Sequence, residues 1–206
     1  MFIKDYFNLT DLQIQQFEQL YQSILYWNEK INLVSRKDVS HLWVRHILHS
    51  VIIAKIISFL PGTHILDVGT GGGFPGIPLA ILFPNCHFTL IDSVAKKINV
   101  VEDIIGTIGL QNVKTQVIRA EDMKGEFDFI VSRAVTQLPE FYKWVCNKVK
   151  SKSRHVLKNG ILYLKGGKIQ QEVEKLGLPV TVYVLAHYSK EEFFRTKYLL
   201  HIPLTS

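Results

Sequence analysis

Two acids and a run of glycines are the residues whose types and spacing most clearly predict chemistry. Asp67 lies in an apolar run over residues 65–68, and four glycines come after it within residues 69–73. Glycines at this point let the backbone turn sharply, and they let a ligand approach the main chain without a Cβ in the way. A second acid, Asp92, ends the next apolar run, where a carboxylate can accept hydrogen bonds from both hydroxyls of a ribose. The pattern therefore predicts a site for a nucleotide cofactor.

Two cofactor classes fit this glycine run in different registers. Gly71, Gly73 and Gly76 match the GxGxxG fingerprint of nicotinamide and flavin enzymes, although that fingerprint normally begins at the end of a strand. The other register, Asp67-x-Gly69-x-Gly71-x-Gly73, starts with an acid on the strand itself. It resembles the first motif of S-adenosylmethionine-dependent methyltransferases. A tight turn without a ligand would not need four glycines in five positions. We favour the methyltransferase register, with a dinucleotide enzyme as the alternative.

Apolar runs of strand length alternate with helical patterns along most of the chain. A capping box at Thr10 and Gln13 predicts a first helix, a second is expected over residues 39–60, and a third over residues 74–83. Strands are expected over residues 64–68, 87–91, 113–118, 127–132, 160–164, 180–187 and 197–203, the last two as an antiparallel pair. This order predicts an α/β protein with a mostly parallel sheet and helices on both faces. Residues 1–62 are expected to form an N-terminal helical appendage, packed as one unit with a domain over residues 63–206.

The ends of the predicted strands carry the remaining polar candidates. Ligands bind beyond the carboxyl ends of parallel strands, so residues that come after the strands should converge on one edge. Glu121 comes after the third strand, where its carboxylate can hold an adenine amino group, and Ala120 is small enough for a ring to lie against the backbone. Arg133 comes after the fourth strand. Glu121 fits equally well as the N-terminal cap of a helix.

Composition and charge limit the class of protein. With 206 residues and 47% hydrophobic content, the chain can bury one sizeable core. Cys86 and Cys146 form no CxxC pair, so the sequence predicts neither a disulfide framework nor a metal site. The N-terminus lacks the pattern of a secretory signal, and the most apolar window, residues 51–60, is too short to span a membrane. We therefore expect a cytoplasmic protein without a membrane segment.

The excess positive charge is concentrated in one stretch of the chain. The net charge is +6, and eight lysines and arginines but no acid lie between Phe141 and Gln171, which leaves +6 − 8 = −2 for the rest. A stretch that contains cations and no acids favours a surface that binds the phosphates of a nucleic acid over an ordinary solvated surface.

Seven stretches together resemble the bacterial 16S ribosomal RNA guanine-N7 methyltransferase family, also called the glucose-inhibited division protein B family. They are WNEKINLVSRKD (27–38), WVRHILHS (43–50), DVGTGGGFPGIPLAI (67–81), LIDSVAKK (90–97), RAED (119–122), IVSRAVTQL (130–138) and LYLKGG (162–167). The resemblance covers almost the whole chain. It implies a Rossmann-like class I methyltransferase fold, S-adenosylmethionine as cofactor, and a guanine in small-subunit ribosomal RNA as the methyl acceptor.

The resemblance also implies which residues bind. Cofactor contacts are expected at Gly69, Gly71, Phe74, Asp92, Ala120, Glu121 and Arg133. Separately from the resemblance, candidate contacts to the RNA on the same edge are Arg36, Arg45, His46 and Lys165, with surface charge or structural hydrogen bonding as the alternative role of equal weight. A monomer is expected to act on the RNA or the small ribosomal subunit. One departure is His49, where family members commonly carry an acid in the pattern RHxLDS.

The residues after the fourth strand limit the methyl acceptor further. Methylation of an exocyclic amine usually goes with an Asn/Asp-Pro-Pro-aromatic motif, whereas this chain reads SRAV over residues 132–135. Attack through pyrimidine C5 needs a cysteine nucleophile, and neither cysteine is placed to serve. Guanine N7 has an unprotonated lone pair, so direct in-line displacement needs no general base, and no residue is assigned as acid or base. The alternatives are a methyltransferase of another RNA or a small molecule, and a non-catalytic assembly factor.

Overall fold

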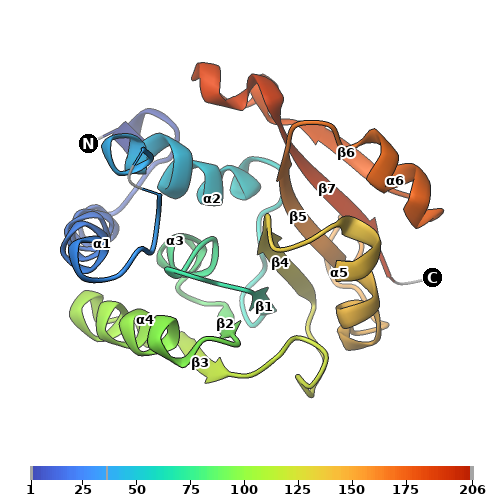
Figure 1. The fold of residues 1–206 in the computed structure, drawn as a ribbon, viewed down its shortest axis with the longest axis horizontal. Helices are drawn as coiled ribbons and strands as arrows, with labels where there is room; N and C mark the ends of the chain where they lie inside the picture. Colours follow the sequence, from blue (N-terminus) through green and yellow to red (C-terminus); the bar gives the residue numbers. More distant parts are fainter. Residues whose placement is uncertain (1, 36, 205–206) are drawn as a thin grey trace.

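A seven-stranded sheet forms the centre of the protein in the computed structural model, which describes residues 2–35 and 37–204 (Figure 1). The strand order is β3-β2-β1-β4-β5-β7-β6. The strands are β1 His64–Val68, β2 His87–Asp92, β3 Val113–Val117, β4 Phe129–Arg133, β5 Gly160–Gly166, β6 Thr181–Val184 and β7 Lys197–Pro203. The first five run parallel, and β7 pairs antiparallel with both β5 and β6. The predicted mostly parallel α/β fold is confirmed.

Helices cover both faces of this sheet (Figure 1). On one side lie α1 Asp11–Lys30, α3 Gly76–Leu82 and α4 Ala95–Ile108, and on the other α5 Leu138–Val145 and α6 Gln170–Leu176. Side chains alternate along a strand, so each face builds its own core. Ile65 belongs to the core under α1, α3 and α4, whereas Leu66 packs in the core under α5.

The N-terminal segment shares the first of these two cores. The Thr10 hydroxyl accepts from the Gln13 amide and the Gln13 side chain accepts from the Thr10 amide, which confirms the predicted capping box at the start of α1. Phe17 and Leu20 are fully buried in the same cluster as residues of the sheet. The division at residue 62 stays a prediction, because one continuous core crosses it.

The second predicted helix differs from the expectation. Residues 39–55 form a helical segment of mixed type: the 3₁₀ helix η2 Val39–His41, the π-helix η3 Trp43–Leu48, the short α2 His49–Val51 and the 3₁₀ helix η4 Ile52–Lys55. The His49 amide reaches the Val44 carbonyl, and the Ser50 hydroxyl donates to the His46 carbonyl at 2.7 Å. These bonds draw main-chain acceptors away from the regular α pattern. The helical backbone ends at Lys55, five residues before the predicted end.

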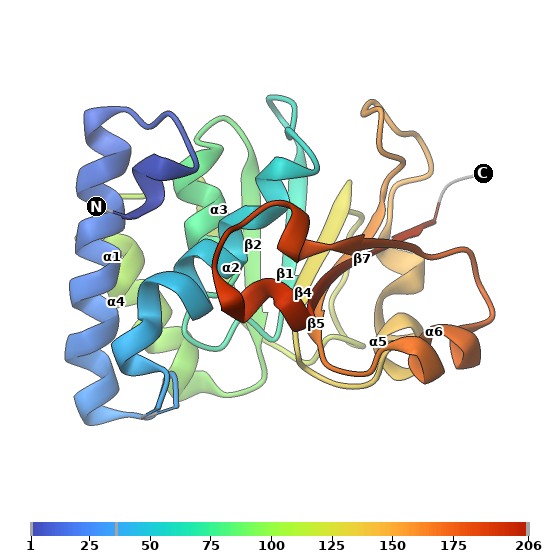
Figure 2. The same cartoon turned by 90° about the horizontal axis from the view of Figure 1, so that it is seen from above.

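The cationic stretch predicted to form one face is divided between the two ends of the sheet. Lys165 and Lys168 lie at the carboxyl end of β5, whereas residues 150–158 form a loop before its amino end (Figure 2). The seven residues of β5 separate them by about 20 Å. The prediction of a single phosphate-binding face is therefore wrong.

Candidate cofactor site and the adjoining cationic cavity

Asp67 fixes the turn that carries the glycines. Its carboxylate is fully buried, and Oδ2 accepts from the Thr70 hydroxyl at 2.6 Å and from the Gly76 amide at 2.8 Å. A Cβ on Gly76 would lie 2.7 Å from Oδ2, so only glycine lets the start of α3 approach this acid. Burial raises the pKa of Asp67 to about 7, although both hydrogen bonds oppose the shift. The acid on the strand thus holds the loop between β1 and α3 in place.

Asp92 connects that loop to the start of α4. Its Oδ2 accepts from the Gly71 amide at 3.0 Å and its Oδ1 from the Val94 amide at 2.9 Å. The Lys97 ammonium lies 3.6 Å from Oδ2. Each carboxylate oxygen has a second lone pair, so Asp92 can still accept from a hydroxyl group.

An open cavity of about 410 Å³ lies beyond the carboxyl ends of β1 to β4. Five predicted cofactor residues line it together: Gly69, Asp92, Ala120, Glu121 and Arg133. Two other predicted contacts do not line it. The Gly71 backbone amide donates a hydrogen bond to the Asp92 carboxylate. Phe74 is only 2% exposed, and its ring packs against the Arg133 guanidinium.

Gly69 lies in the wall of the cavity at a position that requires glycine. Its φ is +67°, and a Cβ there would lie 2.6 Å from Val135 Cγ2. Val135 belongs to the loop after β4. Its amide and that of Thr136 donate to the buried Tyr163 hydroxyl at 3.1 and 3.0 Å, and the hydroxyl donates to the Thr136 carbonyl at 2.8 Å. This loop is therefore pinned close to the glycine.

Several residues of the cavity wall were not predicted from the sequence. Val94 and Val135 each expose more than a third of their surface, and Lys97 and Trp144 also line the cavity. Their position after strands β2 and β4 was a usable signal for the two valines. Trp144 lies on α5, where a helical apolar pattern gives no indication that its edge reaches a ligand site.

A buried lysine holds the segment that carries Glu121. Lys148 is 4% exposed, and its ammonium donates to the Glu121 carbonyl at 3.2 Å. The Glu121 side chain itself is exposed. Lys148 was predicted only as part of the cationic stretch, but the structure uses it inside the protein.

Arg133 lies between this cavity and the N-terminal segment. Its NH2 group donates to His46 Nδ1 at 2.9 Å, its NH1 group donates to the Arg45 carbonyl at 3.3 Å, and its guanidinium lies 5.1 Å from the centre of the Phe74 ring. Burial lowers the pKa of Arg133 to about 10, and the nearby Asp67 and Asp38 oppose the shift. The guanidinium is therefore charged at neutral pH.

His46 is neutral and has a defined proton position. A guanidinium has donors only, so His46 Nδ1 must accept and the proton lies on Nε2. Nε2 is 3.9 Å from Asp38 Oδ2. Burial, and then the charge of Arg133, lower the pKa of His46 to about 3. Asp38, His46 and Arg133 thus form a chain from the N-terminal segment to the cavity.

A second cavity of about 210 Å³ lies on the other side of Arg133, and Arg133 and Ala134 line both. Arg45, His46 and Lys165, three of the predicted RNA contacts, line this second cavity, together with Lys197. Arg36, the fourth, lies outside the described residues.

Lys165 and Arg45 differ in how far they are free to bind. The Lys165 side chain is 11% exposed, and its ammonium is held by Glu172 at 2.8 Å and by the Thr136 carbonyl at 3.0 Å. It serves the loop after β4 from within the protein. The Arg45 side chain is 36% exposed and pairs with Asp38 at 2.7 Å. Arg45 can therefore still reach a ligand.

His49, the departure from the expected RHxLDS pattern, lies inside the protein. It is buried against Phe193 and Phe194, with ring centres 5.2 and 5.7 Å apart, and burial holds its pKa well below the usual value. Asp38, not His49, is the group that pairs with Arg45 and faces His46.

Neither a membrane span nor a metal cluster occurs in the part of the chain that the structure describes. Within residues 2–35 and 37–204, no helix is both long and apolar enough to cross a membrane. The same residues contain no group of three or more His, Cys, Asp or Glu side chains that could hold a metal ion.

Comparison with known proteins decides the family. A family model described as rRNA small subunit methyltransferase G (GidB) matches residues 13–195. The chain belongs to this family. Membership of this family also decides between the two interpretations of the glycine run. The chain is an S-adenosylmethionine-dependent methyltransferase, so a dinucleotide site is excluded.

Curated relatives match over nearly their full length. A protein named ribosomal RNA small subunit methyltransferase G from Flavobacterium johnsoniae is 55% identical over 98% of this chain and 96% of its own. One of the same name from Cytophaga hutchinsonii is 51% identical over 98% of both chains.

Solved structures share the fold at low sequence identity. An S-adenosylmethionine-dependent methyltransferase from Aquifex aeolicus matches with a TM-score of 0.58 at 15% identity, over 82% of this chain and 98% of that one. A mutant of MtNAS in complex with S-adenosylmethionine matches with a TM-score of 0.59 at 13% identity, over 93% of this chain and 72% of that one. The predicted Rossmann-like fold class of this chain is confirmed.

The larger cavity fits the cofactor. Its volume lies within the range of small-molecule sites. Asp92 and Glu121 supply acceptors for hydroxyl and amino groups, and Val94, Val135 and Trp144 supply apolar surface for a ring. Acceptors beside apolar walls are the set of groups that an adenosyl moiety requires.

Proposed function

We propose that the protein transfers a methyl group from S-adenosylmethionine to N7 of a guanine in 16S ribosomal RNA, without a general base. The observation that carries this proposal is the position of Arg133, whose side chain forms a wall of both the cofactor cavity and the cationic cavity. A cofactor in one cavity and a base in the other would meet beside this residue.

Each predicted contact residue is assigned to a different part of the cofactor. When bound, S-adenosylmethionine supplies an electrophilic methyl group on a positively charged sulfur. We assign Asp92 to the ribose hydroxyls and Glu121 to the adenine amino group, with Ala120 and Gly69 leaving room for the ring and the chain. Gly71 and Phe74 act indirectly, because Gly71 orients Asp92 and Phe74 supports the Arg133 guanidinium.

The second cavity suits a nucleotide of an RNA. Arg45 and Lys197 bring positive charge to its wall, and phosphate is the natural partner of such groups. Phe193 adds an aromatic face on which a base can stack. His46 cannot serve as a base here, because its lone pair already accepts from Arg133. Guanine N7 needs no base, which agrees with this arrangement.

The chain is proposed to act as a monomer in the cytoplasm, where small ribosomal subunits are available.

The substrate is tested by mapping modified nucleotides in ribosomal RNA. RNA from a strain that lacks the gene should have lost one N7-methylguanine in 16S RNA, and a plasmid copy should restore it. A Glu121→Gln copy should restore less, because the amide has one neutral acceptor oxygen in place of the two charged oxygens of the carboxylate. An unchanged map would contradict the proposal and favour another RNA or a small molecule. Restoration by a copy that cannot bind S-adenosylmethionine would favour an assembly factor.

A further inference from the structure

A loop at the amino end of the sheet, far from both cavities, carries a cluster of cations. This amino-edge loop comprises residues 151–158, between η5 Cys146–Lys148 and β5. Lys152, Arg154 and Lys158 are exposed, and Val156 between them is exposed over its entire side chain. The loop projects from the end of the sheet opposite to the loops after β1, β2 and β4 (Figure 2). Neither cavity of the proposed active site includes any of its residues.

The amino-edge loop is fixed to the body of the protein. His155 Nε2 accepts from the Leu60 amide at 3.1 Å, and its ring packs edge-on against Phe129 with ring centres 5.0 Å apart. The Asn159 side chain donates to the carbonyls of Lys150 and Lys152 at 3.2 and 2.9 Å. A loop held at its base and middle loses little conformational entropy on binding, so its cations are ready to bind a ligand.

One acid lies next to the loop, and it is buried and paired. Lys150 pairs with Asp128 at 2.9 Å, and Asp128 is 3% exposed, so this acid lies beneath the cations rather than among them. The loop contains three cations and no acid, so its own formal charge is +3.

We propose that the amino-edge loop is a second RNA-binding surface, which contacts phosphates of the ribosomal RNA at a distance from the methylated guanine. The inference rests on the proposed ribosomal RNA substrate. Because β5 alone spans about 20 Å, only a large folded RNA can reach the loop and the cavities together. Lys152, Arg154 and Lys158 bind the phosphates, and Val156 lies against the sugar or base edge between them.

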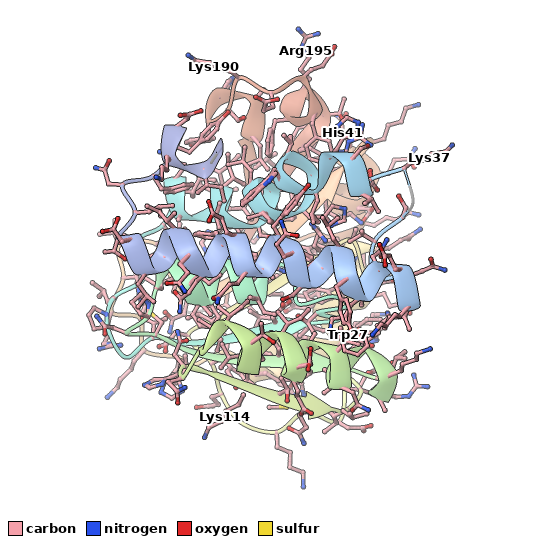
Figure 3. All side chains as sticks on the ribbon, turned by 90° about the vertical axis from the view of Figure 1, so that its left-hand side faces the viewer. Trp27, Lys37, His41, Lys114, Lys190 and Arg195 are labelled. Carbon is pink, nitrogen blue, oxygen red and sulfur yellow. The ribbon has the colours of Figure 1, made fainter. Side chains whose placement is uncertain are left out.

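A triple variant with a matched control tests the surface. Lys152→Gln/Arg154→Gln/Lys158→Gln removes three charges from the loop, and Lys4→Gln/Lys114→Gln/Lys190→Gln removes three exposed charges that lie apart from one another. Lys114 and Lys190 point away from the body at different places (Figure 3). Labelled methyl transfer is measured with small subunits that lack the modification, and cofactor affinity by calorimetry.

The loop variant should raise KM for the subunit about fivefold or more, with kcat and cofactor affinity unchanged. Losing three phosphate contacts should also reduce the slope of log affinity against log salt by about 2. The control should change both quantities much less. Equal changes in the two variants would contradict the proposal, because total charge and not the loop would then be responsible. Absence of transfer by the unaltered chain would instead refute the proposed substrate.

Cross-linking identifies the partner of the loop independently. A photoreactive benzophenone amino acid in place of Val156 should cross-link to 16S RNA in the complex with the small subunit. The same group in place of Leu12, which is 63% exposed on α1, serves as the control and should give little RNA product. A cross-link at position 156 to ribosomal protein alone would overturn the proposal.

Discussion

Substitution of Gly69 by alanine should affect the protein in two ways, through backbone strain and through a change in the shape of the cofactor cavity. Gly69 has φ +67°, a region in which an alanine costs about 1–2 kcal/mol. Its added Cβ would lie 2.6 Å from Val135 Cγ2, whereas carbon atoms pack at about 3.5–4.0 Å. Val135 must therefore move by roughly 1 Å. The Tyr163 hydroxyl pins the loop that carries Val135, so this movement disturbs the wall of the cavity.

Gly109→Ala is the matched control for Gly69→Ala. Gly109 ends α4 with φ +73°, and a Cβ there meets no atom within 4 Å. Both variants should lower the melting temperature by about 2–8 °C, since they share the strain of about 1–2 kcal/mol. Only Gly69→Ala should weaken S-adenosylmethionine binding in calorimetry, by about tenfold, or about 1.4 kcal/mol. Adding Val135→Ala should restore part of the affinity. Equal affinity of the two glycine variants would refute the reasoning.

Three further predictions concern the groups around the cavity. His46→Ala removes the nitrogen that accepts a hydrogen bond from Arg133, and it should lower kcat/KM by about tenfold or more. His46→Asn keeps an acceptor and should recover part of this loss. Equal loss in both variants would mean that the bond to Arg133 is irrelevant. Lys148→Met should weaken cofactor binding by releasing the Glu121 segment, and unchanged binding in calorimetry would contradict that role. Because the pKa of His46 is about 3 when folded and near 6.5 when unfolded, the unfolded chain binds the extra proton between these values. Stability should thus fall as pH decreases from about 6.5 to 3, by up to about 1.4 kcal/mol per pH unit from this group. Denaturant titrations should show a shallower fall for His46→Asn, and identical slopes would count against the assignment.

The strands and the end of the sheet that binds ligand were predictable because they depend on local patterns. Short apolar runs bounded by turn residues gave all seven strands to within a few residues, and the rule for carboxyl ends brought Asp92, Glu121 and Arg133 to one cavity. Thr10 and Gln13 marked the start of α1 by side-chain bonds within a single turn.

The remaining features depend on contacts between distant segments. The π-helix at Trp43–Leu48 was not predicted, because its apolar spacing looks like that of a regular helix. The run of cations appeared as one surface in the sequence, yet β5 divides it in space, and Lys148 and Lys165 are bound inside the protein. Asp38 could not be recognised as the partner of Arg45 and His46, because they are seven and eight positions apart across a helical segment of mixed type.

Methyl transfer from labelled S-adenosylmethionine to purified small ribosomal subunits tests the central claim most directly. The subunits come from a strain that lacks the modification, and the labelled nucleotide is identified after complete digestion of the RNA. The account predicts a single labelled product, N7-methylguanosine, in 16S RNA. A label on another atom or another base, or no transfer at all by a chain that binds the cofactor, would contradict it.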